Sequence, residues 1–164
     1  MNAPATYTKR LTHPVGYRYL HTAIDDRTRI AYSEIHSDEL GVTAAEFWTR
    51  ATRWFATIGI ACQRVITDNG ACYRSRAWRH ACHATGTTVK KTRPFRPQTN
   101  GKVERFHRIL LEEWAYIRPW TSDRQRTHHY HGFIHFYNHH RPHGALNWAT
   151  PISILRDNLP EEHN

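Results

Sequence analysis

Two carboxylates stand alone in a strongly basic part of the chain. Residues 47–111 contain thirteen Lys or Arg but only two acids, Asp68 and Glu104. A basic surface is a natural partner for phosphate backbones. Carboxylates are preferred ligands of hard cations such as Mg²⁺, and a cation held between acids and phosphates is central to phosphoryl transfer. The pattern predicts that Asp68 and Glu104 are catalytic metal ligands that hold Mg²⁺ (or Mn²⁺) against DNA.

The local sequence predicts how these two carboxylates are positioned. Residues 60–67 read as a buried strand, and Asp68-Asn69-Gly70 follows as a turn. Ligands of open α/β sheets bind where strands end. Glu104 falls in the first turn of a predicted helix of about five turns, where the positive end of the helix dipole favours a carboxylate and attracts phosphate. Its apolar stripe is Val103, Phe106, Leu110, Trp114 and Ile117. The alternative is a turn Asp and a helix-start Glu without chemistry.

The remaining periodicity predicts an α/β order of elements. Thr43 with Glu46, and Ser122 with Gln125, are predicted capping boxes that begin two helices. Gly59 and Gly86 are predicted to end helices. The expected elements are a hairpin of 16–24 and 30–36, a helix from 43 to Gly59, a helix over 74–85, a strand over 87–92, a helix from 122 that ends at 141–144, and a short helix over 150–155.

Three further groups have both a functional and a structural interpretation. Asp25 and Asp26 are candidate metal ligands, but a role as turn residues is the favoured interpretation. Arg74, Arg76 and Arg79 are candidate phosphate contacts or a solvated helix face. His residues three or four apart can ligate a transition metal, but no Cys or acid completes a ligand set here, so a wet helix face is favoured. This histidine stripe comprises His128, His131, His135 and His139.

Composition bounds the class of protein. The 164 residues are enough for one domain with a core. The net charge of +9 and the pI of about 9.9 point to nucleic acid rather than a membrane as the partner. The sequence has neither a long apolar run nor a signal peptide. Cys62, Cys72 and Cys82 form no CxxC pair, which is typical of reduced thiols. A cytoplasmic protein that acts on DNA is therefore expected.

The spacing of the two acids resembles a known signature. Thirty-five residues separate Asp68 from Glu104, within the words ITDNG and RPQTNGKVERFHRIL. Together with the tail YNHHRPH and the later Thr150-Pro151, they closely resemble the catalytic core of bacterial insertion-sequence transposases and retroviral integrases, whose pattern is Asp, Asp, thirty-five residues, Glu. The resemblance covers nearly the whole chain. A lone DNG would be weak evidence, but the spaced set is specific.

The resemblance implies a fold and a reaction. The fold is α/β and ribonuclease-H-like, with a mixed sheet of about five strands flanked by helices. The reaction is hydrolysis at a transposon end, then attack of the freed 3′-OH on a target phosphodiester, with two Mg²⁺ ions that serve nucleophile and leaving oxygen. The implied partners are transposon-end and target DNA, and further copies of the complete protein in a homo-oligomer, with no membrane. The implied location is the bacterial cytoplasm, at the nucleoid.

The loop before Glu104 lies beside the active site in this family, which makes its polar residues candidate DNA contacts. Arg141 and His143, after the last long helix, are further candidates because they can reach phosphate or support the acidic site from outside. The predicted DNA-binding residues are Asn69, Lys91, Arg93, Arg96, Gln98, Asn100, Lys102, Arg105, Arg141 and His143.

The sequence departs from the family pattern in one place. The family's first Asp lies on the first strand, but no acid precedes Asp25. We therefore expect an N-terminally truncated core that lacks the first strand and is a weak or inactive catalyst alone. The alternative function is a non-catalytic remnant that only binds nucleic acid. The expected organisation is a partly disordered segment at 1–15, the core with its C-terminal helices at 16–156, and a tail at 157–164.

Overall fold

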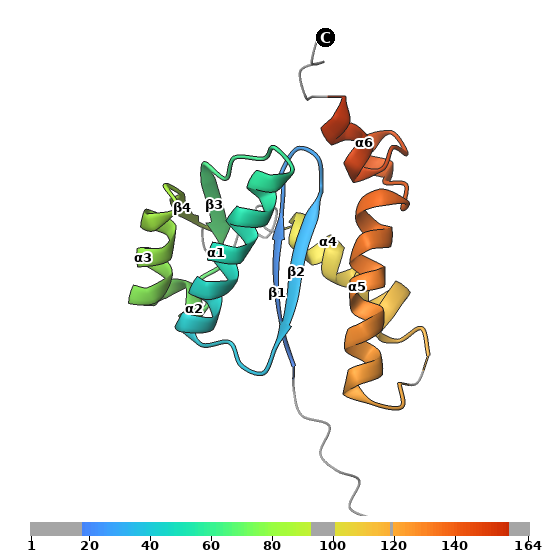
Figure 1. Cartoon of the computed structure of the whole chain (residues 1–164), viewed down its shortest axis with the longest axis horizontal. Coiled ribbons are helices and arrows are strands. Elements are labelled where there is room, and N and C mark those ends of the chain that lie inside the picture. The colour runs from blue at the N-terminus through green and yellow to red at the C-terminus, as the bar shows by residue number, and fades with distance from the viewer. Residues whose placement is uncertain (1–17, 93–100, 119, 158–164) are drawn as a thin grey trace, which may run out of the picture.

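The computed structural model describes residues 18–92, 101–118 and 120–157 (Figure 1). The N-terminal segment predicted at 1–15, and the predicted tail beyond its first residue, lie outside the described residues. The described part places a β-hairpin between two groups of helices, with α1, α2 and α3 on one side and α4, α5 and α6 on the other.

The hairpin has the predicted position. Strand β1 (Tyr19–Ile24) pairs antiparallel with β2 (Ala31–His36). Its turn is organised by Asp25, whose carboxylate accepts hydrogen bonds from the backbone N–H of Arg27 (3.2 Å) and from the N–H and hydroxyl of Thr28 (both 2.8 Å). These bonds confirm the turn interpretation of Asp25, because its side chain satisfies the turn it stands in.

The second pair of strands is shorter than predicted. Strand β3 (Arg64–Thr67) pairs in parallel with β4 (Thr88–Lys91). The prediction of a buried strand over 60–67 was wrong at its start and in its burial, since Ile66 is 45 % exposed. Among the described residues the two pairs are separate two-stranded sheets, where about five strands in one mixed sheet were predicted. With β4 as its one described neighbour, β3 has less cover than a central strand.

Helix α1 (Gly41–Thr57) packs on one face of the hairpin, and the short helices α2 (Ala71–Arg74) and α3 (Arg76–Ala84) pack against α1. Their core is aromatic: Phe47, Trp48 and Phe55 of α1 pack with Trp78 of α3. The capping box predicted at Thr43 was wrong. The helix begins at Gly41, and the Thr43 hydroxyl donates to Asp38 instead of capping the helix. A hydroxyl that is hydrogen-bonded to a nearby carboxylate does not cap the helix.

Helices α4 and α5 cover the opposite face of the hairpin, while α6 packs on α5 and contributes Leu155 to the first core. Helix α4 (Gly101–Leu110) continues as the π-helical turn η2 (Leu111–Ala115), followed by α5 (Asp123–His139), the 3₁₀ turn η3 (Gly144–Leu146) and α6 (Pro151–Arg156). The prediction of one regular five-turn helix was wrong beyond Leu110. A π turn holds more residues than an α turn and rotates the side chains beyond it, so Trp114 is buried while Ile117 is 63 % exposed.

The C-terminal helices begin as predicted. Ser122 caps α5 by accepting the N–H of Gln125, and Thr150 caps α6 by accepting the N–H of Ser153, with Pro151 in the first helical turn. The second half of the Ser122 capping box is absent, because Gln125 bonds Thr121 instead. Tyr130, Phe133 and Tyr137 of α5 form the second core with α4 and η2.

Candidate active site and nucleic-acid interface

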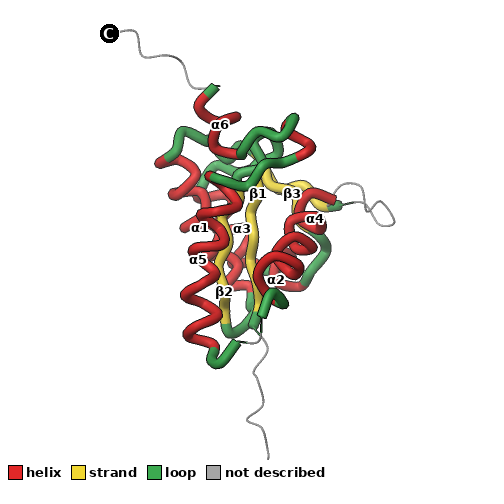
Figure 2. Tube along the Cα trace, turned by 90° about the vertical axis from the view of Figure 1, so that its right-hand side faces the viewer, coloured by secondary structure: helices red, strands yellow, loops and turns green. Residues whose placement is uncertain are grey.

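Asp68 lies directly after Thr67, the last residue of β3. Figure 2 shows the course of β3 in the fold. One of its carboxylate oxygens accepts the backbone N–H of Gly70 at 2.8 Å, which fixes the carboxylate over the turn. A Cβ atom on Gly70 would stand 2.9 Å from that same oxygen, so glycine leaves the space that the carboxylate fills. The Asn69 amide donates to the Thr92 carbonyl at 3.4 Å and links the ends of β3 and β4. The turn therefore presents an exposed, oriented carboxylate.

Glu104 lies in the first turn of α4, as predicted, and its side chain is exposed. The opposite face of α4 is anchored in the second core by Phe106, Ile109 and Leu110. Within the described part of the chain, the Glu104 carboxylate has no hydrogen-bond or ion-pair partner. A helix fixed on one face and bearing an unpartnered carboxylate on the other offers that group to something outside the chain.

The two carboxylates are the kind of ligand that proteins commonly use to bind Mg²⁺. Mg²⁺ is held by one or two carboxylates, and water and substrate phosphates complete its shell. Asp68 and Glu104 can supply two such carboxylates. Among residues 18–92, 101–118 and 120–157, no three His, Cys, Asp or Glu side chains are grouped so that they could hold a metal ion. In the histidine stripe, His135 and His139 stack face to face with ring centroids 4.4 Å apart.

The candidate DNA contacts fall into three sets. Asn69, Lys91 and Arg105 are exposed and lie close in sequence to the two carboxylates or to the end of β4. Arg93, Arg96, Gln98 and Asn100 lie outside the described residues. Lys102 is exposed, but its ammonium group is bound to Asp26 of the hairpin turn.

One candidate residue was missed by the sequence prediction. Arg108 is exposed and lies four residues after Glu104 on α4. Residues four apart lie on the same helix face, so its guanidinium stands one turn beyond the carboxylate. This spacing is visible in the sequence. The prediction included Arg105 but not Arg108, because it considered residues in and next to the loop and did not consider which residues share a helix face with Glu104.

Two predicted DNA contacts take structural roles. The Arg141 guanidinium donates three hydrogen bonds to the Glu113 carboxylate, at 2.6, 2.9 and 3.0 Å, and so joins the end of α5 to η2. His143 is buried, 3.4 Å from the Tyr137 carbonyl and edge-to-face with the Tyr137 ring. Burial lowers the pKa of His143. The prediction of direct DNA contact was wrong for His143, because its side chain faces the core.

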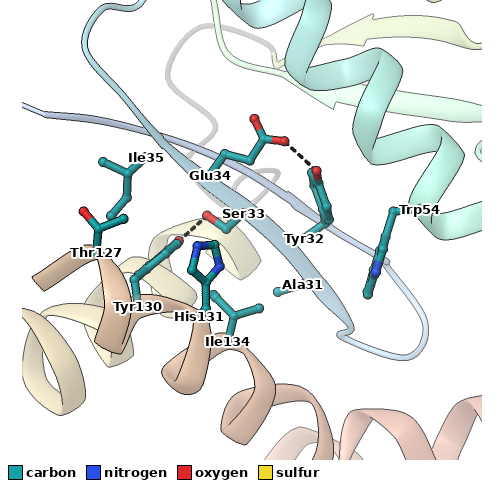
Figure 3. A pocket seen from close by; sticks show the side chains of 10 residues that line it. All are labelled: Ala31, Tyr32, Ser33, Glu34, Ile35, Trp54, Thr127, Tyr130, His131 and Ile134. Carbon is teal, nitrogen blue, oxygen red and sulfur yellow. Dashed lines mark hydrogen bonds between the residues drawn. The ribbon is translucent and has the colours of Figure 1, made fainter. Parts of the chain in front are cut away.

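Two further features of the surface bear on the prediction. Arg74, Arg76 and Arg79 are all exposed around α2 and α3. A cavity of about 450 Å³ lies between β2 and α5 (Figure 3), with Glu34, Trp54 and His131 in its lining and neither Asp68 nor Glu104. Among the described residues no helix has the length and apolar character needed to cross a membrane.

Two family models match this chain, and together they cover residues 6–151. The integrase core domain family matches residues 6–97, and a second family of the same description matches residues 85–151. The protein named integrase ORF3 of Spiroplasma virus SpV1-C74 is 28 % identical over 151 residues, covering 84 % of this chain and 41 % of that protein. Transposase InsD for insertion element IS2A/D/F/H/I/K of Escherichia coli is 30 % identical over 91 residues, covering 56 % of this chain and 30 % of that protein. The chain thus spans less than half the length of these curated relatives.

Solved structures show the fold. A chain of the simian T-cell lymphotropic virus intasome, in complex with PP2A regulatory subunit B56 gamma, has a TM-score of 0.69 at 20 % identity and covers 90 % of this chain and 50 % of that chain. The catalytic core domain of BIV integrase has a TM-score of 0.66 at 18 % identity, covering 85 % of this chain and 86 % of that one. These likenesses confirm the predicted ribonuclease-H-like fold. One family match extends over more than half of the residues of this chain. The chain therefore belongs to the integrase core domain family, within the superfamily of DDE transposases and retroviral integrases.

Proposed function

We propose that this chain is the catalytic core of a transposase that cleaves DNA at a transposon end and transfers the strand to target DNA. The observation that carries the proposal is the pair of exposed carboxylates, Asp68 at a strand end and Glu104 at a helix start, within a chain of net charge +9. Membership of the integrase core family supports the reaction class.

In this proposal each residue has a distinct role. Asp68 and Glu104 would hold divalent metal, which when bound supplies positive charge to the reacting phosphate and its nucleophile. Gly70 orients Asp68 through its N–H, and the apolar face of α4 positions Glu104. Lys91, Arg105 and Arg108 would hold backbone phosphates, which positions DNA without reading its sequence.

Metal binding and strand joining test the proposal together. Mn²⁺ titrated by calorimetry into the chain with a DNA end should bind, and joining of that end should require Mg²⁺ or Mn²⁺. Glu104→Gln and Asp68→Asn should each abolish both signals. Glu112→Gln is the matched control, because Glu112 is an exposed acid that follows directly in η2. Joining that persists in Glu104→Gln, or is lost equally in Glu112→Gln, would contradict the assignment of the site.

A second function, binding DNA without catalysis, is favoured by one observation. Among the described residues, neither Asp68 nor Glu104 belongs to a group of three side chains that could hold a metal ion. In that case DNA binding should weaken steeply with salt, because counterion release drives it, while Mn²⁺ binding and joining should be absent in the unmodified chain. Affinity for DNA that is indifferent to salt would contradict both functions.

A further inference from the structure

Several cations surround one exposed carboxylate at the tip of the hairpin. The Lys102 ammonium contacts the Asp26 carboxylate and lies 3.2 Å from the Asp26 carbonyl oxygen. The Arg29 guanidinium contacts the same carbonyl and lies 3.8 Å from the same carboxylate oxygen. The hydrogen bond from Lys102, followed by the charges of Lys102, Arg29 and Arg64, holds the pKa of Asp26 below its usual value. Cations from the hairpin turn and from α4 therefore share one acid.

The hairpin turn holds Arg29 in place before any ligand arrives. Arg29 has a φ of 65°, in the left-handed region that non-glycine residues rarely adopt. The turn is fixed by the Asp25 bonds and by its neighbours Thr28 and Ile30, which are 3 % and 1 % exposed. Such strain is kept only where the surrounding structure determines it. The Arg29 side chain is itself only 22 % exposed, so its direction is set by the fold.

The Asp26 carboxylate, by contrast, is easily displaced. Its side chain is 87 % exposed, and ion pairs in such positions contribute roughly 0–1 kcal/mol to stability. The carboxylate presents one oxygen to both cations, while the Asp26 carbonyl belongs to the fixed turn and stays in place. A phosphodiester also presents anionic oxygen and carries the same charge. Arg and Lys bind both kinds of group by the same charge-assisted hydrogen bonds.

We propose that Arg29 and Lys102 form a binding site for a backbone phosphate of DNA, and that the Asp26 carboxylate occupies this site in the free protein. Lys102 lies two residues before Glu104, so a phosphate bound here would place DNA along the first turn of α4. The inference rests on the proposed function, since it names where the DNA backbone enters the site. Asp26 then weakens binding to any polyanion that cannot displace it.

The test is a gain of affinity. Binding of a labelled duplex to the full chain is measured by fluorescence anisotropy over a range of sodium chloride concentrations. Asp26→Asn keeps the shape of the side chain and removes its charge. It should tighten binding several-fold at low salt, and the slope of log affinity against log salt should steepen by about one to two, since each added phosphate contact contributes about 0.9. Arg29→Gln or Lys102→Gln, added to Asp26→Asn, should remove the gain.

Asp157→Asn is the matched control, because Asp157 is also exposed and the charge change is identical. Equal gains in Asp26→Asn and Asp157→Asn would show a general charge effect and overturn the site. No change in Asp26→Asn, while the unmodified chain binds DNA, would overturn the site but leave the proposed function standing. Absence of DNA binding in the unmodified chain and in every variant would overturn both the phosphate site and the proposed function.

Free phosphate is the other possible source of the same chemistry. Sodium phosphate and sodium chloride at matched ionic strength should displace the duplex to the same extent. Stronger displacement by phosphate, lost in the Arg29→Gln variant, would make this a site for small anions and overturn its assignment to the DNA backbone.

Discussion

Two of the three glutamates on the helix that starts at Gly101 and continues through η2 have opposite settings. Glu104, in its first turn, is exposed and has no partner among the described residues. Glu113, in the π-helical turn, accepts three hydrogen bonds from Arg141, and the two side chains are 36 % and 22 % exposed. The same residue type thus stabilises the fold at one end and is free for chemistry at the other. A carboxylate satisfied within the chain is a weak candidate for metal, however basic its surroundings.

The largest effect should come from breaking the Arg141 contact. Arg141→Met leaves the partly buried Glu113 carboxylate without its donors, and a lost charged hydrogen-bond pair of this kind costs about 2 kcal/mol. Urea unfolding should show a lower midpoint with an unchanged slope. Glu104→Gln is the control, with a change within about 0.5 kcal/mol, as for exposed sites without contacts. Equal destabilisation by the two changes would contradict the assignment of a structural role to Glu113 and of none to Glu104.

A smaller effect is expected from Gly70→Ala, which acts on the carboxylate at the strand end. The added Cβ would lie 2.9 Å from the Asp68 oxygen that Gly70 now holds, so the carboxylate must rotate. Since φ at Gly70 is −53°, the backbone accepts alanine without strain. We expect several-fold weaker Mn²⁺ binding, measured by calorimetry, with almost unchanged urea stability. Gly132→Ala, on α5 with open space around the new Cβ, is the control and should leave Mn²⁺ affinity unchanged.

The smallest effect is a dependence of stability on pH. Burial lowers the pKa of His143, beside Arg141, and of His107 on α4. The unfolded chain therefore binds protons on these rings more readily than the folded one. Their contribution is fully present above the unfolded pKa near 6.5 and is lost as pH falls from there through the lower folded pKa. Urea midpoints should fall between pH 7.5 and 5.5, and His143→Gln should flatten the decline.

A steeper decline in His143→Gln than in the unmodified chain would show that other groups control stability in this range. Carboxylates with lowered pKa, such as Glu34, contribute only at more acidic pH, because their unfolded pKa is about 4.5. The range from 7.5 to 5.5 therefore isolates the histidines.

Local patterns predicted most elements because their causes are local. The hairpin, α3, α5 and α6 follow from periodicity and from caps such as Ser122 and Thr150, whose bonds reach only three residues. The errors occurred where another partner competed. Thr43 donates its hydroxyl to Asp38, five residues earlier, instead of capping the helix. The end of the Glu104 helix is a π turn in which Trp114 packs against Tyr130 of α5.

The sequence by itself determined the two solitary acids, their spacing of thirty-five residues and the basic field around them. Those features are properties of the chain order and its composition. Only the tertiary structure decided which cations remain available, because Lys102 meets Asp26 and Arg141 meets Glu113 across separations of 76 and 28 residues. The partner of a charged side chain cannot be read from the sequence alone. Pairing depends on the distance between side chains, and packing of the hairpin and helices sets that distance.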